Sequence, residues 1–160
     1  LTGLFNHRIF YERLNDELNR AKRYDSPLSM VLVDLDNFKS VNETKGHQFG
    51  DHLLVRSAER MRADLRQTDI LCRYGGDEFG IILPETSRPD AMAMMCRLAE
   101  DFRELGRVEG APDGFGMSFG LSTHPEDQGT VRHMVKAADD RLILTKKSRV
   151  ALQLANGRHA

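Results

Sequence analysis

The chain has 160 residues, 40% of them hydrophobic, and a formal net charge of −1 at pH 7. This length and apolar content predict a single domain over residues 1–160 with a full hydrophobic core. The balanced charge argues against nucleic-acid binding, and no apolar run is long enough to span a bilayer, so we expect no nucleic-acid partner and no membrane contact by this domain. Because the first residue is leucine, we expect a domain excised from a larger protein.

Hydrophobic periodicity predicts helices and strands in alternation. In chain order we expect a helix over about 6–24, a strand over 28–35, a helix over about 47–66, strands over 70–74 and 79–83, a helix over about 89–105, a strand over 116–123 and a helix over about 131–147. The segment "VALQLA", residues 150–155, is a candidate for a last strand of the sheet. Alternating elements with a hairpin in the middle indicate a mixed α/β domain.

The strand over 28–35 and the turn after it carry two acids. Asp34 lies in the apolar run "LSMVLVDL", where an unpaired buried carboxylate would cost several kcal/mol, so we expect a cationic group to meet it. Asp36 follows two residues later. We interpret it as a cap of the turn "DNFK", in preference to a direct metal ligand.

A second pair of acids lies in the hairpin stretch "RYGGDEF". Gly75 and Gly76 can take the positive φ angles of a tight turn, which leaves Asp77 and Glu78 at its tip. Taken alone, this pattern is typical of a solvated polar turn. If the strand that contains Asp34 pairs beside the hairpin, however, Asp34 and Asp77 come together. Two carboxylates with a backbone carbonyl would suit magnesium.

The same stretch contains a family signature, and three other segments follow that family in order and spacing: "LTGLFNHRIF", "DLDNFKSVNETKGHQFGD" and "MSFGLST". On these motifs the chain resembles the GGDEF family, the diguanylate cyclases, over almost its whole length. The resemblance implies an α+β fold with a ferredoxin-like core, similar to adenylyl cyclases and polymerase palm domains, in which helices flank a mainly antiparallel central sheet. It also implies a reaction in which two GTP condense to cyclic di-GMP and pyrophosphate.

The resemblance assigns metal and phosphate chemistry to particular residues. It implies a Mg²⁺ or Mn²⁺ site formed by Asp34, the Leu35 carbonyl, Asp77 and Glu78. Asp77 is also expected to accept the proton of the attacking hydroxyl, with Glu78 supporting the metal. Lys39 is expected near the phosphates, and a solvated helix charge is the alternative. Further substrate contacts are expected at Phe38, Gly75 and Gly76.

Guanine offers two adjacent donors on one edge, so a carboxylate together with a carboxamide can select it. The resemblance implies that Asn42 and Asp51 read the base and that His47 also contacts the nucleotide. Each reader has a structural alternative, Asn42 as a turn residue and Asp51 as an acid favoured in the first turn of a helix. Because both fall on the reader positions, we expect GTP rather than ATP as the substrate.

The stretch "RQTD", from Arg66 to Asp69, precedes the hairpin. It resembles the RxxD inhibitory site through which family members bind their own product, cyclic di-GMP. Arginine can form a fork with a guanine edge or a phosphate, and aspartate can accept from guanine. An exposed ion pair at a helix end is the alternative. The register of this motif against the signature favours product feedback.

The C-terminal segment departs from the family pattern. The family reads like "ADxALYxAKxxGRN", whereas this chain reads "AADDRLILTKKSRVAL". Lys146 keeps its place as a phosphate-binding residue, but Ile143 replaces the tyrosine, Thr145 replaces the alanine and the glycine is missing. Arg149, the second expected phosphate contact, comes one residue early.

These observations leave two main functions open. The first is an active diguanylate cyclase, which needs two domains face to face, hence a homodimer, brought together by an unseen N-terminal sensor. The second is a catalytically weak module that binds GTP or cyclic di-GMP and regulates an attached C-terminal phosphodiesterase domain. Another nucleotide cyclase or a hybrid dinucleotide synthase is disfavoured by Asp51.

The remaining signals concern the cell compartment. Cys72 and Cys96 lack metal-ligand spacing, and two reduced thiols fit a reducing cytosol. The first residues also lack the basic and apolar pattern of a signal peptide. We therefore expect the domain in the cytoplasm, whether or not the full-length protein is anchored to a membrane.

Overall fold

The computed structural model describes residues 1–157, with side-chain surroundings to residue 151. The described elements, in chain order, are α1 (His7–Tyr24), β1 (Leu28–Asp36), α2 (Phe38–Lys45), α3 (His47–Asp64), β2 (Ile70–Arg73), β3 (Glu78–Pro84), α4 (Arg88–Glu109), β4 (Gly116–His124) and α5 (Val131–Gly157). None of the described helices is both long enough and apolar enough to span a membrane.

The first helix shows why the predicted periodicity holds. Its apolar side chains recur every three or four residues and are buried at Phe10, Leu14, Leu18 and Ala21. The Asn6 side chain accepts a hydrogen bond from the Ile9 N–H at 3.1 Å, which satisfies one of the free donors at the helix start. Local sequence therefore specifies both the buried face and the beginning of α1.

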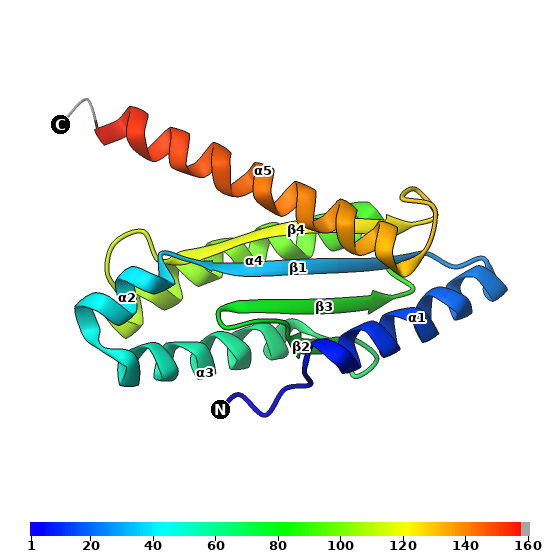
Figure 1. Cartoon of the computed structure of the whole chain (residues 1–160), viewed down its shortest axis with the longest axis horizontal. Coiled ribbons are helices and arrows are strands. Elements are labelled where there is room, and N and C mark those ends of the chain that lie inside the picture. Colours follow the sequence, from blue (N-terminus) through cyan, green and yellow to red (C-terminus); the bar gives the residue numbers. More distant parts are fainter. Residues whose placement is uncertain (158–160) are drawn as a thin grey trace.

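The four strands form one antiparallel sheet in the order β2-β3-β1-β4. Helices α1 and α5 pack on one face, while α2, α3 and α4 pack on the other. In Figure 1, α5 crosses in front of β4 and α4 passes behind it. The predicted fold class, helices flanking an antiparallel sheet, is confirmed.

Strand β1 lies inside the sheet and distributes its side chains between the two cores. Val31, Val33 and Leu35 belong to the core under α2, α3 and α4, whereas Met30 and Leu32 belong to the core under α1 and α5. Side chains alternate along a strand, so Asp34 points to the α1 and α5 face at the end of the sheet. This alternation directs the first acid of the candidate site toward α5.

Two parts of the predicted secondary structure are wrong. Residues 38–45 form the short helix α2 where we expected only a turn, because Phe38 and Val41 are buried against the core although eight residues carry little periodic signal. The segment 150–155 continues α5 instead of forming a strand. Short apolar runs fit helix and strand equally well by periodicity, and here no glycine or proline interrupts the preceding helix.

Candidate active site

The predicted meeting of two acid-bearing segments is confirmed at the end of β1. In the register of β1 with β3, Asp34 lies opposite Glu78, and the Leu35 N–H donates to the Asp77 carbonyl at 3.1 Å. Burial and the nearby Asp34 carboxylate raise the pKa of both Asp77 and Glu78. Three carboxyl groups therefore share a partly buried site, where their mutual repulsion favours a cation.

The hairpin is closed differently from the prediction. Neither Gly75 nor Gly76 has a positive φ. The Tyr74 N–H and the Gly75 N–H both donate to the Glu78 carbonyl, at 2.8 and 3.1 Å, and the Arg73 guanidinium donates to the Gly76 carbonyl at 2.6 Å. The turn is long enough to bend without left-handed residues.

The space beside Gly75 is occupied by the Glu78 side chain. A Cβ added there would lie 2.4 Å from Glu78 Oε2, whereas one added at Gly76 would meet nothing within 4 Å. The Glu78 carboxylate thus rests against the backbone of Gly75. The first glycine of the signature provides room for the acid, and the second has no such contact.

Lys146 is the cation that we expected beside Asp34. Its Nζ lies 2.8 Å from Asp34 Oδ1, and the Asp34 side chain is only 12% exposed. Burial by itself would lower the pKa of Lys146, but the hydrogen bond to Asp34 and the charges of Asp34, Asp77 and Asp36 together raise that pKa. An ammonium group held in this way neutralises part of the charge of the acid cluster.

The prediction that Asp36 caps the following turn is wrong. Its carboxylate accepts a hydrogen bond from Ser118 Oγ at 2.7 Å and forms an ion pair with Arg149, whose other nitrogen donates to the Gly114 carbonyl at 3.2 Å. Asn37, at the start of α2, makes no side-chain capping bond. Burial nevertheless raises the pKa of Asp36. Arg149 is thus bound to Asp36 and to the Gly114 carbonyl at the end of β1.

The acidic and basic side chains described above line a cavity of about 210 Å³ at the end of β1. Its lining includes Asp34, Leu35, Asp36, Asn37, Phe38, Lys39, Asp77, Lys146, Arg149 and Val150. Lys39 is 90% exposed and lies 3.6 Å from Glu43, so the solvated helix charge that we considered also describes its position. It stands at the rim, within reach of a ligand that enters the cavity.

Side chains alone supply only part of the oxygen ligands that a hard divalent cation would need at this cavity. Among residues 1–157, no group of three or more histidine, cysteine or acidic side chains is arranged to hold a metal ion. Asp34 and Asp77 with a backbone carbonyl form the smaller oxygen set that suits Mg²⁺, which keeps water and phosphate ligands. A metal ion would compete with Lys146 for the Asp34 carboxylate.

The two predicted base readers are neighbours in the fold. A Cβ added at Gly50 would lie 1.9 Å from Asn42 Oδ1, so the Asn42 side chain rests on the backbone one residue before Asp51. Asp51 and His47 are exposed in the first turns of α3. The end of α2 and the start of α3 thus bring a carboxamide and a carboxylate to one surface.

The RxxD motif lies at a cavity of about 600 Å³ between α1 and the loop before β2. Asp69 Oδ2 accepts from the Arg66 N–H at 2.8 Å, while no donor within the described part of the chain reaches the buried Asp69 Oδ1. Burial raises the pKa of Asp69. An exposed side-chain ion pair does not describe this arrangement, because the bond comes from the backbone.

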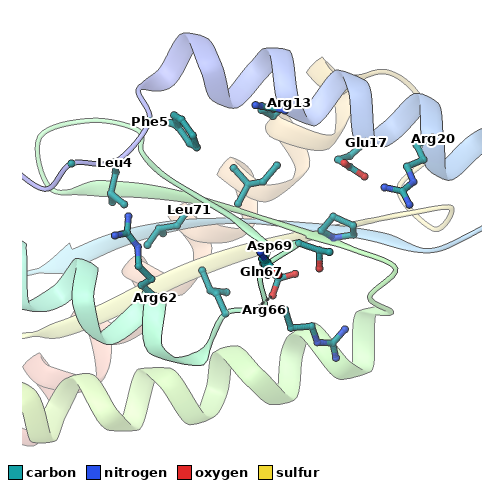
Figure 2. A pocket seen from close by; sticks show the side chains of 15 residues that line it. Leu4, Phe5, Arg13, Glu17, Arg20, Arg62, Arg66, Gln67, Asp69 and Leu71 are labelled. Atoms are coloured by element: carbon teal, nitrogen blue, oxygen red, sulfur yellow. Dashed lines mark hydrogen bonds between the residues drawn. The ribbon is translucent and has the colours of Figure 1, made fainter.

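Three arginines at this cavity were not predicted. Figure 2 shows Arg13 and Arg20 on α1, with Glu17 between them, and Arg62 at the end of α3. The seven-residue spacing of Arg13 and Arg20 places them on one face of a helix, which the sequence could have indicated. Their approach to Arg62 depends on how α1 packs.

Comparison with known proteins agrees with this architecture. The family model described as "Diguanylate cyclase, GGDEF domain" matches residues 1–150. The response regulator PleD of Caulobacter vibrioides is 35% identical over 157 residues, covering 92% of this chain and 33% of its own length. The probable diguanylate cyclase DgcC of Escherichia coli is 31% identical over 149 residues, covering 92% of this chain and 40% of its own length.

A solved structure supports the same relationship. The crystal structure of the GGDEF domain of PA1120 (YfiN or TpbB) from Pseudomonas aeruginosa has a TM-score of 0.82 and 31% identity, over 92% of this chain and 93% of that chain. The chain spans 33% of PleD and 40% of DgcC, so it corresponds to one part of those proteins. By the family match and these relatives, the chain belongs to the GGDEF family of diguanylate cyclase domains.

Proposed function

We propose that this domain is a diguanylate cyclase that condenses two GTP into cyclic di-GMP and pyrophosphate. The observation that carries the proposal is the convergence of Asp34, Asp77 and Lys146 on one cavity at the end of β1. Carboxylates that can hold a divalent cation and an ammonium that can hold phosphate are the groups that nucleotidyl transfer needs. Membership of the family agrees with this chemistry.

The residues divide the work of this reaction. A bound Mg²⁺ or Mn²⁺ would neutralise charge on the transferred phosphate, and Asp34, the Leu35 carbonyl, Asp77 and Glu78 would hold it. Asp77 would accept the proton of the attacking 3′-hydroxyl. Lys146 would bind the phosphates from its position beside Asp34, and Lys39 would add a second positive charge at the rim.

Base selection is assigned to the surface of Asn42 and Asp51. The Asp51 carboxylate accepts from the guanine donors, while Asn42 and His47 make further contacts with the nucleotide. Adenine would leave the Asp51 acceptors without partners, which disfavours ATP. Support comes from the close approach of the Asn42 side chain to the helix turn that carries Asp51.

Catalysis is proposed to need a homodimer. Each domain holds one GTP, and each 3′-hydroxyl must attack the α-phosphate of the other, so two sites face each other across a two-fold axis. Sensor or phosphodiesterase domains elsewhere in the full-length protein would control this meeting. The chain covers only 33% of PleD and 40% of DgcC, so those relatives contain further segments in which such domains could lie.

The proposal is tested by cyclic di-GMP formation from GTP and Mg²⁺, with the domain fused to a dimerising coiled coil. Asp77→Asn keeps the shape of the side chain and removes the base, so we expect product formation to fall roughly 10²-fold or more. Asp16→Asn changes an exposed acid on α1 and should leave the rate unaltered. If the parent forms no product, the cyclase function is rejected.

A second function is favoured by the contacts of α5. Arg149 is paired with Asp36 and Lys146 with Asp34, so the cationic groups expected at the phosphates are bound to acids. A module that binds GTP or cyclic di-GMP without efficient turnover would fit these contacts. The same assay distinguishes the two functions, because such a module would bind a non-hydrolysable GTP analogue and yet form no cyclic di-GMP.

We further propose that the cavity at Arg66 and Asp69 binds cyclic di-GMP as a feedback site. The buried Asp69 Oδ1 has an accepting position to offer, and the arginines supply charge for phosphate. Arg66→Ala should weaken cyclic di-GMP binding about tenfold or more and relieve product inhibition, whereas exposed Arg23→Ala should change neither. Unchanged product affinity in Arg66→Ala, measured by calorimetry, would reject this assignment.

A further inference from the structure

Side chains of the C-terminal helix α5 form hydrogen bonds along one edge of the sheet. Strand β4 is last in the sheet order, and no described strand pairs with its outer edge. Residues four apart on α5 reach this edge: Arg141 donates to the Leu121 carbonyl at 2.7 Å, and Thr145 Oγ1 lies 3.3 Å from the Phe119 carbonyl and 3.0 Å from the Arg141 carbonyl of its own helix. Arg149, four residues further, reaches the Gly114 carbonyl just before the strand. One face of α5 therefore satisfies acceptors along the open edge of β4.

Arg141 is the strongest of these attachments. Its guanidinium donates to both carboxylate oxygens of Asp127, at 2.8 and 2.7 Å, in addition to the Leu121 carbonyl. Asp127 also accepts from the Thr123 N–H at 2.9 Å and pairs with Arg88 at the start of α4. A forked arginine contact has defined geometry, so it fixes direction as well as distance. Arg141 thus joins α5 to β4, to the following loop and to α4.

The helix backbone rests directly on the strand near this point. A Cβ added at Gly120 would lie 1.9 Å from the Ala138 carbonyl oxygen and 2.6 Å from the Leu142 nitrogen. Close packing prevents α5 from moving toward the sheet, but a backbone contact at a glycine does not by itself prevent sliding or rotation. The fork between Arg141 and Asp127 supplies a directional restraint next to that contact.

The part of α5 that Arg141 holds is followed directly by the part that contributes to the candidate active site. Lys146 follows Arg141 by five residues, which is about 7.5 Å along a helix. A shift of α5 by one residue, about 1.5 Å with a rotation of about 100°, would carry Lys146 away from Asp34. Lys146 itself is 45% exposed, so its own packing restrains it little. The family pattern quoted above has alanine at positions 141 and 145, where this chain has arginine and threonine.

We propose that Arg141 is a positioning residue for the active site. By holding Asp127 and the Leu121 carbonyl, it sets the axial position and rotation of α5, and thereby places the Lys146 ammonium at Asp34 and at the phosphates of a bound nucleotide. The placement of Lys146 at the nucleotide phosphates rests on the proposed cyclase function. The placement of Lys146 beside Asp34 is independent of that function, and it can be measured without nucleotide.

The first measurement is the acylation rate of lysine amines, followed residue by residue by mass spectrometry. In the parent, the ion pair with Asp34 protects Lys146, while exposed Lys147 provides an internal reference. Arg141→Ala should raise the reactivity of Lys146 relative to Lys147 about threefold or more. Asp127→Asn weakens the same paired contact from its other partner and should also raise the relative reactivity of Lys146. The proposal can therefore be tested even if Arg141→Ala fails to fold. Unchanged relative reactivity in the folded variants would overturn the proposal.

The second measurement is the affinity for a non-hydrolysable GTP analogue with Mg²⁺, at a temperature where every variant is folded. Arg141→Ala and Lys146→Ala should each weaken binding about tenfold, and the double variant should bind no more weakly than Lys146→Ala alone. Lys136→Ala, which removes an exposed ion pair with Asp140 on the same helix, should bind like the parent.

The outcomes separate the two proposals. Independent, additive losses for Arg141→Ala and Lys146→Ala would mean that Arg141 affects binding without acting through Lys146, which overturns the positioning role. If the parent does not bind the analogue, the proposed cyclase function fails. The positioning role is then decided by the amine reactivity alone.

Discussion

Single residues of the signature hairpin have separate physical tasks. Gly75 leaves space that the Glu78 carboxylate occupies, while Gly76 borders open space. The sequence led us to expect one shared reason for both glycines, a positive φ, and neither has it. A glycine selected for close approach and one selected for turn formation look the same in a sequence.

This difference predicts unequal effects of two matched variants. Gly75→Ala should displace the flexible end of Glu78 and lower cyclic di-GMP formation, with little change in melting temperature because the carboxylate can move aside. Gly76→Ala adds the same methyl group where no protein atom lies within 4 Å, so it should leave Glu78 in place and lose less activity than Gly75→Ala. Product formation and thermal unfolding measured in parallel check both. Equal loss of activity in the two variants would contradict the role assigned to Glu78.

Among the elements, α5 supplies two cationic side chains that pair with acids at the site. It brings Lys146 to Asp34 and Arg149 to Asp36, and it is held by Arg141 at Asp127. The Arg141 guanidinium, with the Thr123 N–H and the charge of Arg88, lowers the pKa of Asp127 from 3.8 to about 2. Because the folded-state pKa lies below the usual value, ionised Asp127 stabilises the fold above about pH 4, and this contribution is lost as pH falls toward 2.

The shift corresponds to roughly 2 kcal/mol of unfolding free energy near neutral pH. Asp127→Asn should therefore be less stable than the parent by about that amount at pH 7, and the difference should shrink as pH falls from about 4 toward 2. Urea unfolding at a series of pH values measures it. A difference that stays constant across this acidic range would show that charge on Asp127 is not its source.

At the scale of the whole molecule, one sheet positions the three surfaces that we propose as ligand sites. The acid cavity lies at the end of β1, the Asn42 and Asp51 surface lies at the junction of α2 and α3, and the arginine cavity lies between α1 and the loop before β2. The first two would serve one GTP. In the proposed reaction, a second GTP would then come from another domain, so the reaction would depend on association.

This requirement predicts how the rate depends on concentration. For the unfused domain, cyclic di-GMP formed per domain should rise with protein concentration, and fusion to a dimerising coiled coil should remove most of that dependence by raising the effective concentration. Initial rates over a dilution series, with sedimentation on the same samples, provide the measurement. A constant rate per domain in samples that sediment as monomers would contradict the need for two facing sites.

Much of this architecture could be predicted from the local sequence pattern. The long amphipathic helices, the buried strand β1 and the hairpin follow from periodicity and turn residues, and the placement of Asp34 near Asp77 follows once the two strands pair. A cation beside Asp34 could be expected because a buried carboxylate needs a partner. These inferences depend on neighbours along the chain and on the cost of burial.

Contacts between distant segments could not be predicted in this way. Asp36 meets Ser118 and Arg149 because β4 and α5 both pack beside the end of β1, and the arginine cavity forms because α1 lies over the loop before β2. Helix α2 forms because tertiary packing buries its two apolar side chains despite weak local signals. A sequence specifies which groups must find partners, but the partner of each is chosen by packing, since many residues offer similar charge and only a few come within hydrogen-bonding distance.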